Sequence, residues 1–172
     1  IVNGTYVSNS EFLIGAQGAL GGAGLIRGNI ANSGVVAPGN SPGTLTITGN
    51  YAQTSTGSLN VEIASSTNFD QLHVSGTATL GGTLNIIPYG GNTLAYGQQY
   101  NFLQAGSITG NFATITAPDT FRGRFLNLGT TGTILIAPDS YTRVAVTPNQ
   151  RNVAKALDSF IPATSGDRMT VS

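Results

Sequence analysis

The stretch that decides the fold of this 172-residue chain reads Gly39-Asn40-Ser41-Pro42-Gly43-Thr44-Leu45-Thr46-Ile47-Thr48-Gly49. Its glycines and proline predict a tight turn, because Gly adopts positive φ without a steric penalty and Pro42 restricts φ to about −65°. After the turn, Leu45 and Ile47 alternate with threonines, a two-residue period typical of a strand with one buried face. We therefore predict a half-buried strand over 44–48.

Similar tripeptides recur elsewhere in the chain. Three pairs are found: Leu45-Thr46-Ile47 with Leu72-His73-Val74, 27 positions later; Leu59-Asn60-Val61 with Leu84-Asn85-Ile86, 25 positions later; and Leu20-Gly21-Gly22 with Leu80-Gly81-Gly82. Short strands that repeat every 20–50 residues or so are typical of a solenoid. In a parallel stack each strand pairs with the strand one turn later, so the inward Leu, Ile and Val form a continuous core.

The composition fits an ordered, uncharged protein. Hydrophobic residues make up 40% of the chain and charged residues only 8%, with zero net charge. Seven basic residues spread along the chain argue against nucleic-acid binding and against a polybasic membrane patch. The chain has no Cys, which excludes disulfides and thiolate metal sites. It has no signal peptide or long apolar run, and it begins within the strand pattern, so we expect a fragment of a longer protein.

Short strands also dominate the first 36 residues. We predict them over 5–7, 11–14, 19–20, 25–30 and 35–36, with Gly, Asn or Ser at each break. Such strands are compatible with a sandwich or a barrel, but hairpin turns of the Asn-Gly type are nearly absent, which favours the solenoid. Outward Asn residues, such as those of the second tripeptide pair, are expected to form amide ladders.

Aromatic residues gather in the segment 88–140. We predict a loop at 88–92 and strands over 100–103, 112–115, 124–128 and 133–136, separated by glycines that include Gly106. The large residues are Tyr96, Tyr100, Phe102, Phe112, Phe121 and Phe125. Because rings cover more apolar area than Val or Leu, we interpret 88–140 as a β cap over the C-terminal end of the stack.

The C-terminal part contains the clearest helix signal. Thr147 as N-cap, Pro148 at the first helical position and Gln150 three residues after the cap predict a helix over about 147–161. Its apolar stripe is Val153, Leu157, Phe160 and Ile161, and Pro162 ends it. We predict one more strand over 141–146 and a flexible tail after the helix.

The sequence contains only weak evidence for catalytic residues. Gly39-Asn40-Ser41-Pro42-Gly43 matches the G-x-S-x-G pattern of hydrolases, but Pro42 cannot donate the N–H that an oxyanion hole needs, and a strand follows. His73 shares a strand face with Ser75 and follows Asp70, yet inward Leu72 and Val74 place His73 on the solvent face. We interpret both motifs as structural.

Metal and polysaccharide-cleaving sites are also not indicated. The seven carboxylates are scattered along the chain: Glu11, Glu62, Asp70, Asp119, Asp139, Asp158 and Asp167. We expect them on solvated loops and strand faces, although Glu62 and Asp70 could meet across neighbouring turns. No calcium-loop motif is present. Arg122 and Arg124 flank Gly123, which is typical of an edge strand protected by charge. We predict no catalytic, cofactor-binding or metal-binding residues.

Several segments together resemble one protein family. The similar segments are Gly34-Val35-Val36-Ala37-Pro38-Gly39-Asn40-Ser41-Pro42-Gly43-Thr44-Leu45, Gly57-Ser58-Leu59-Asn60-Val61-Glu62-Ile63, the run from Asp70 to Leu84, and the helix from Asn149 to Asp158. Over about residues 18–160 the chain resembles the C-terminal passenger region of autotransporters, the type V secreted proteins of Gram-negative bacteria. It departs from the family pattern in that it stops soon after the helix, without the membrane barrel.

The resemblance implies a fold, a division of the chain and a role. The fold would be an all-β, right-handed parallel β-helix with a C-terminal β cap and a short C-terminal α-helix. Residues 1–43 would be the last passenger coils, 44–140 the autochaperone-like coils and cap, and 141–172 the linker to the absent barrel. The role would be structural rather than enzymatic: a folding nucleus and stalk base at the bacterial cell surface that templates the passenger and supports secretion through the outer membrane.

The expected partners follow from that role. They are the chain's own outer-membrane barrel and the upstream coils, with a host surface ligand as an addition and no nucleic acid. We also expect end-to-end self-association through the strand edge near Ile1. Two alternatives stay open: an adhesin whose Thr and Asn faces bind host glycans or protein, and a β-helical carbohydrate-active enzyme.

Overall fold

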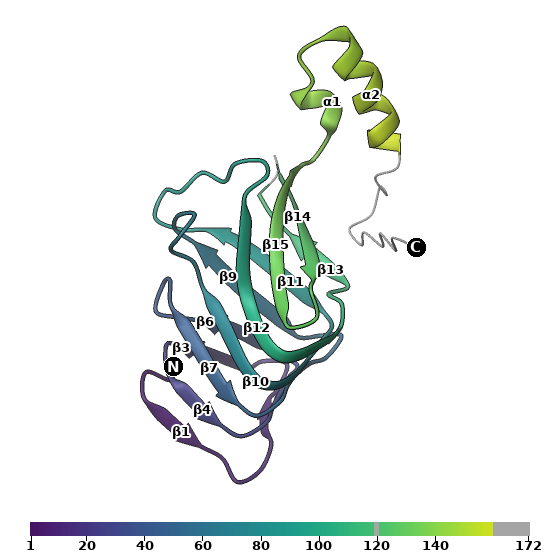
Figure 1. Ribbon diagram of the computed structural model, residues 1–172. Helices are drawn as coiled ribbons and strands as arrows, with labels where there is room; N and C mark the ends of the chain where they lie inside the picture. The colour runs from purple at the N-terminus through teal and green to yellow at the C-terminus, as the bar shows by residue number, and fades with distance from the viewer. Residues whose placement is uncertain (119–120, 160–172) are drawn as a thin grey trace.

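Strands recur in three positions along the chain, and each position forms a parallel ladder (Figure 1). The computed structural model describes residues 1–118 and 121–159. The first ladder runs in the order β1 (Thr5–Val7), β4 (Leu25–Arg27), β7 (Thr44–Thr48), β10 (Gln71–Leu80) and β12 (Gln99–Gly110). The fold is therefore built by stacking successive passes of the chain.

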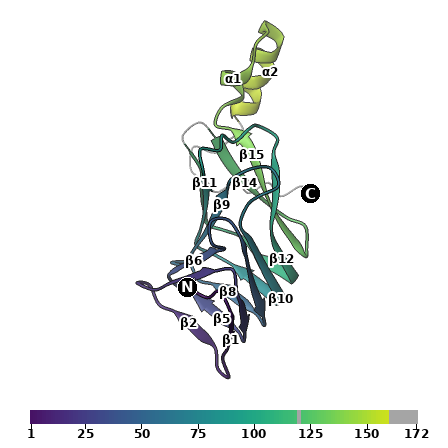
Figure 2. The same ribbon diagram turned by 90° about the vertical axis from the view of Figure 1, so that its left-hand side faces the viewer.

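The other two ladders flank the first (Figure 2). The second ladder contains β2 (Phe12–Ile14), β5 (Ile30–Asn32), β8 (Tyr51–Gln53) and the second half of β10. The third contains β3 (Ala19–Gly22), β6 (Val35–Pro38), β9 (Ser58–Ile63), β11 (Thr83–Pro88) and β13 (Thr114–Thr116). One pass through the three positions is called a triplet below. The expectation of an all-β fold with parallel sheets is confirmed.

The strand register explains two of the three tripeptide repeats. Leu72 pairs with Leu45 in the first ladder, and Leu84 pairs with Leu59 in the third. The third repeat is misleading, because Leu20 lies in β3 opposite Val36, whereas Leu80 ends β10 in another ladder. A Gly-Gly pair marks a corner but carries no side chain that distinguishes one corner from another.

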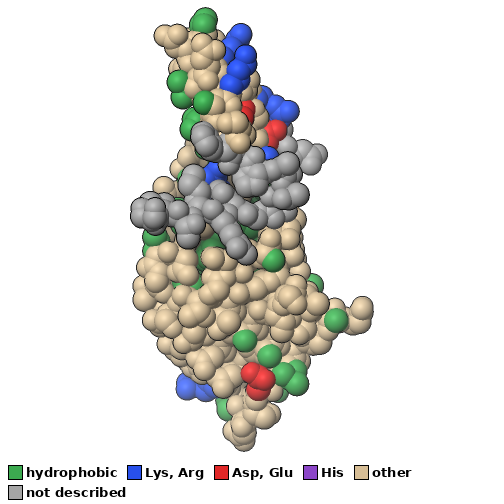
Figure 3. Space-filling model, turned by 90° about the vertical axis from the view of Figure 1, so that its right-hand side faces the viewer, with side chains coloured by type: hydrophobic (Ala, Val, Ile, Leu, Met, Phe, Trp, Pro, Cys, Tyr) green, Lys and Arg blue, Asp and Glu red, His purple; other side chains and the backbone are tan. Residues whose placement is uncertain are grey.

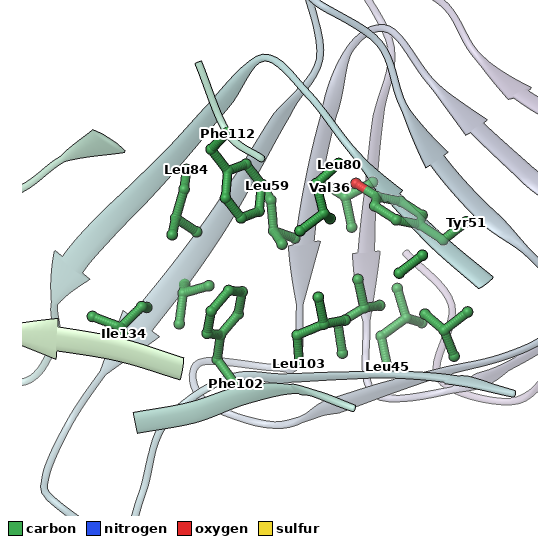
Figure 4. Packing of buried hydrophobic residues seen from close by; sticks show 14 of the residues in the cluster. Val36, Leu45, Tyr51, Leu59, Leu80, Leu84, Phe102, Leu103, Phe112 and Ile134 are labelled. Carbon is green, nitrogen blue, oxygen red and sulfur yellow. The ribbon is translucent and has the colours of Figure 1, made fainter. Parts of the chain in front are cut away.

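Inward side chains of paired strands form continuous columns in the core (Figure 4). Leu45, Leu72 and Leu103 follow one another in the first ladder, and each is fully buried. In the third ladder the column is Val36, Leu59 and Leu84. Burying one such side chain contributes roughly 1.5–3 kcal/mol, so most of the stabilisation comes from neighbouring passes.

One corner of the stack requires glycine in several successive passes. A Cβ on Gly34 would lie 2.2 Å from the carbonyl oxygen of Gly18, and a Cβ on Gly82 would lie 2.1 Å from that of Gly57. Because no real side chain fits at such distances, these glycines let the backbone of successive passes approach closely.

Several predicted strand boundaries are wrong, and glycine explains most of them. The strand predicted over 25–30 is two strands, because the chain turns a corner at Gly28, whose φ is +140°. Gly106 was assigned to a connection but lies inside β12, where its missing Cβ makes room for the Ser75 carbonyl. The strand β8 was not predicted at all. Glycine thus marks both corners and tight stacking within strands.

The pairing changes direction after β12. The strand β15 (Thr131–Pro138) pairs antiparallel with β12, and β14 (Phe121–Asn127) pairs antiparallel with β15. The strand β15 extends the prediction over 133–136 at both ends, whereas β14 begins three residues before the predicted 124–128 and ends one residue earlier. The prediction over 112–115 is shifted, since β13 begins at Thr114 and Phe112 lies buried before it.

Two helices project from the sheets: α1 (Tyr141–Val144) and α2 (Pro148–Ser159) (Figure 1). The capping box of α2 is confirmed, since Thr147 Oγ1 accepts from Gln150 N at 3.2 Å and Gln150 Oε1 accepts from Thr147 N at 2.9 Å. The strand predicted over 141–146 is wrong, because hydrogen bonds to α2 hold its first half in a helical turn. Phe160, Ile161, Pro162 and the predicted tail lie outside the described residues.

Candidate functional site

The motif around Ser41 has no arrangement suited to catalysis. Ser41 itself has a positive φ of 62° within a turn, Pro42 follows it, and the chain then enters β7 rather than a helix. A nucleophile elbow requires a helix after the serine and an N–H on the next residue. The geometry agrees with a structural turn.

The structure does not assemble His73, Asp70 and Ser75 into a triad. His73 lies on the outer face of β10, and its Nε2 is 3.0 Å from Gln71 Oε1. Ser75 is exposed on the same face, whereas Asp70 is buried and bonded elsewhere. The placement of His73 outward, between buried Leu72 and Val74, is confirmed.

Asp70 contradicts the expectation that the carboxylates are solvated. Its side chain is only 1% exposed, and its two oxygens accept hydrogen bonds from Gly43 N and Glu62 N, each at 2.9 Å. Burial raises the pKa of Asp70 to about 6, although both hydrogen bonds act to lower it. Glu62 and Asp70 do approach each other, but through the connection from β9 to β10 rather than across neighbouring triplets.

The remaining described carboxylates are separate from this position. Glu11 is exposed, Asp139 forms an ion pair with Arg143, and Asp158 binds the start of α1. Asp119 and Asp167 lie outside the described residues. Within residues 1–118 and 121–159, no three His, Asp or Glu side chains come together in a group that could hold a metal ion.

A buried polar network occupies the corner between the second and third ladders. Asn32 Nδ2 donates to Tyr51 Oη at 3.1 Å, and Tyr51 Oη donates to Gln53 Oε1 at 2.7 Å. Gln53 Nε2 reaches the backbone carbonyls of Gly81 and Thr83 in the next triplet. Burial raises the pKa of the Tyr51 hydroxyl above its ordinary value. The network therefore joins three successive triplets by hydrogen bonds as well as by packing.

The N-terminal end of the stack is open. The strands β1, β2 and β3 each have a partner strand on one side only. Tyr6, Val7 and Leu13 at this end are 43%, 60% and 70% exposed. Unpaired edges of this kind accept a further strand through backbone hydrogen bonds.

At the C-terminal end of the stack the first ladder is covered, whereas β13 is an edge strand of the third ladder. The strand β15 lies along β12, and the rings of Phe102, Phe112 and Phe125 form mutual contacts with centroids 5.1–6.4 Å apart. Phe102 and Phe112 are seen in Figure 4. The outer strand β14 pairs only with β15 and carries Arg122 and Arg124, as expected for a charged edge strand. The two ends of the stack therefore differ in both pairing and side chains.

The two helices pack against each other through a carboxylate. Asp158 of α2 accepts hydrogen bonds from Ser140 Oγ, Tyr141 N, Thr142 N and Thr142 Oγ1, at 2.6–3.0 Å. The hydrogen bonds from the Ser140 and Thr142 side chains hold the pKa of Asp158 well below its usual range. The helices carry apolar side chains along one side and Lys and Arg along the other (Figure 3).

Reasoning from the sequence missed three important positions. Asn32 and Gln53 occupy inward positions by simple alternation, two residues after Ile30 and Tyr51, so their register was a usable signal. For Asp158 the signal was weaker: a Ser-x-Thr pair at 140 and 142 that resembles a helix start, 16 residues or more before the carboxylate that it binds.

Neither helix within the described ranges has both the length and the apolar character needed to cross a membrane. No protein-family model matches the chain, and no curated protein shows significant sequence similarity to it.

Proposed function

We propose that this chain is the C-terminal part of an autotransporter passenger, and that it acts as the folding nucleus and stalk base of that passenger. Its role is structural and non-enzymatic. It folds as a right-handed parallel β-helix with a C-terminal β cap, exposed on the bacterial surface after export through the outer membrane. The upstream coils and the outer-membrane barrel are its partners.

The observation that carries the proposal is the difference between the two ends of the stack. Antiparallel β15 and β14 close one end, while β1, β2 and β3 present unpaired edges at the other. In the first ladder a further parallel strand can therefore be added beside β1 but not beside β12, whose outer side is paired with β15. A folded stack of this kind offers a template to preceding coils, which then avoid the entropic cost of forming the first long-range contacts.

Aromatic packing at the covered end supports the proposal. The Phe102, Phe112 and Phe125 rings contact one another, and Phe69 meets Tyr100 edge to face at 5.2 Å. Aromatic pairs add about 0.5–1.5 kcal/mol each beyond their buried area. Under this proposal residues 44–140 nucleate folding, 1–43 are the last templated coils, and 141–172 lead to the barrel.

The experiment that tests the proposal measures the order of folding in the full 172-residue chain. Refolding from denaturant is sampled by pulsed hydrogen exchange with mass spectrometry. We expect amides of β10, β11, β12 and β15 to be protected before those of β1–β6. Simultaneous protection, or earlier protection of β1–β6, would contradict a C-terminal nucleus.

Matched substitutions sharpen this experiment. Phe125→Ala removes a ring from the covered end, and Phe12→Ala removes one from the first triplet; both rings are partly buried against the core. For a C-terminal nucleus, Phe125→Ala slows refolding by roughly five- to tenfold, whereas Phe12→Ala leaves refolding within about twofold and accelerates unfolding. The reverse pattern would refute the proposal.

The alternative roles rank lower on the same geometry. An adhesin would present an apolar or aromatic patch away from the ends, but most exposed apolar side chains lie in the first triplet or on the helices. The exposed Tyr89 and Tyr96 lie in the connection from β11 to β12, where Tyr96 packs on Phe121. A carbohydrate-active enzyme would need two carboxylates that converge on a groove. The buried Asp70 carboxylate instead accepts hydrogen bonds from two backbone N–H groups.

A further inference from the structure

We infer that residues 139–146 form a two-state connector, helical when Asp158 binds residues 140–142 and extended in continuation of β15 when it does not. The contact of Asp158 with residues 140–142 is called the clasp below. This inference concerns the projecting helices and does not depend on the proposed function.

The clasp concentrates an unusual number of hydrogen bonds on one side chain. Four donors from three consecutive residues converge on Asp158, which lies 16–18 positions later in the chain. Two of the donors are backbone N–H groups at the start of α1 and two are hydroxyls. Charge-assisted hydrogen bonds of this kind are about twice as strong as neutral ones.

Little else in the structure stabilises the helical turn. The helix α1 has only four residues and none of them is buried, while Ser140 makes no side-chain cap of its own because its hydroxyl binds Asp158. Isolated helices shorter than about 12 residues are marginal in water. The helical state of α1 therefore rests on the clasp and on contact with α2.

The local sequence favours the other state. Every second residue from 142 to 146 is β-branched: Thr142, Val144 and Val146. Such residues have low helix propensity and high strand propensity. Both flanking residues already have extended backbone angles, with ψ of 131° at Ser140 and 124° at Ala145. Four residues separate these two flanks, so the change needed is confined to α1.

Asp139 shows that the helical state carries a local cost. Its Oδ2 pairs with Arg143 Nη1 at 2.6 Å, but its Oδ1 is buried without a hydrogen-bond partner among the described atoms. A buried polar atom without a partner costs about 1–3 kcal/mol. An extended connector separates Asp139 from Arg143, whose side chain is already 60% exposed, and frees the Asp139 carboxylate to bind water, which brings the two states closer in free energy.

The clasp therefore controls the distance between the sheets and α2. Four residues lengthen by about 1.8 Å each when a helical rise of about 1.5 Å becomes an extended rise of about 3.3 Å, which gives roughly 7 Å. Opening also uncovers Ala154, which is 4% exposed against α1 in the clasped state.

The test compares Asp158→Ala with Asn152→Ala, a control at an exposed position on the same helix, in the full chain. Backbone chemical shifts report the conformation of residues 139–146, 148–157 and the sheets separately. In Asp158→Ala we expect residues 140–145 to move to extended values while α2 and the sheets keep theirs, with no change in Asn152→Ala. Unchanged shifts at 140–145, or simultaneous loss of α2, would overturn the two-state connector.

A distance measurement gives an independent readout. The chain has no native Cys, so spin labels at Leu128→Cys and Lys155→Cys report the separation of the sheets from α2. We expect the mean distance to change by up to about 7 Å when Asp158→Ala is added, and to return toward the original value in Asp158→Glu, which retains a carboxylate. Identical distance distributions in all variants would refute the inference.

Discussion

One carboxylate, that of Asp70, connects the turn at 39–43 to two strands. It binds Gly43 N just before β7 and Glu62 N within β9, and a Cβ on Gly39 would lie 2.5 Å from its Oδ1. The turn, the glycine and the buried acid therefore depend on one another. Such a buried acid makes folding stability depend on pH.

The pKa of Asp70 predicts the sign of that dependence. The folded-state pKa of about 6 exceeds the ordinary value of 3.8, so the folded state binds the proton more tightly. The free energy of unfolding should therefore rise by on the order of 2 kcal/mol as pH falls from about 6.5 to 4. Urea unfolding at several pH values, with Asp70→Asn for comparison, measures this contribution.

In Asp70→Asn the amide does not titrate, so the stability difference between the two proteins should grow on acidification. The other described carboxylates are the same in both proteins, so the difference reports Asp70 together with its interaction with Glu62. Parallel pH curves for the two proteins would contradict the assignment.

The alternation of apolar and polar residues was enough to predict that His73 points outward and that the leucine columns point inward, because each strand has one buried face. It did not identify Asp70 as buried, since the residue precedes β10 and its partners come from two other segments. Long-range backbone donors leave no local pattern in a sequence.

At the scale of elements, the glycine corner makes a prediction that separates backbone strain from close packing. Gly82 and Gly90 both have left-handed backbone angles, with φ of 58° and 64°, but a Cβ would meet the Gly57 carbonyl only at Gly82. We expect Gly90→Ala to cost about 1 kcal/mol of unfolding free energy and Gly82→Ala at least about 3 kcal/mol. Thermal and urea unfolding measure both, and equal losses would show that contact between passes is unimportant at this corner.

The elements themselves were predictable where the alternation was long. The strand β7 was located correctly, and the matching tripeptides lie in β9 and β11, which also carry Leu, Ile or Val at alternate positions. The short strand β8 was missed because its inward residues, Tyr51 and Gln53, are polar-tipped and satisfied by the buried network. The helical turn α1 was missed because Asp158 overrides a strand-like local sequence.

For the whole molecule, the open end predicts self-association of limited size. We expect this chain to dimerise at high concentration through the β1–β3 end, since backbone groups and exposed apolar side chains lie there together. Dimers should dominate, because the exposed apolar side chains lie at the β1–β3 end, whereas the edge strand β14 at the covered end carries Arg122 and Arg124. Sedimentation equilibrium measures the effect.

Two valine substitutions make this measurement specific. Val7→Lys places a charge at the open edge, and Val146→Lys places one at an exposed position beyond α1; the two valines are 60% and 78% exposed. Only Val7→Lys should weaken association, by about tenfold or more in the dimer dissociation constant. A monomeric parent chain, or equal effects of the two changes, would exclude the open end as the contact.

The number of residues per triplet increases along the chain, and this increase determines how much chain each triplet releases when the molecule is pulled. Paired positions in the first ladder are 20 residues apart from Thr5 to Leu25, 27 from Leu45 to Leu72 and 31 from Leu72 to Leu103. A force applied to the N-terminus loads the outermost strands first and peels one triplet at a time. At about 3.5 Å per extended residue, the released lengths grow from roughly 70 Å to roughly 110 Å toward the covered end. Under tension the stack would therefore dissipate energy in steps, and the longest segments, next to the covered end, would unfold last.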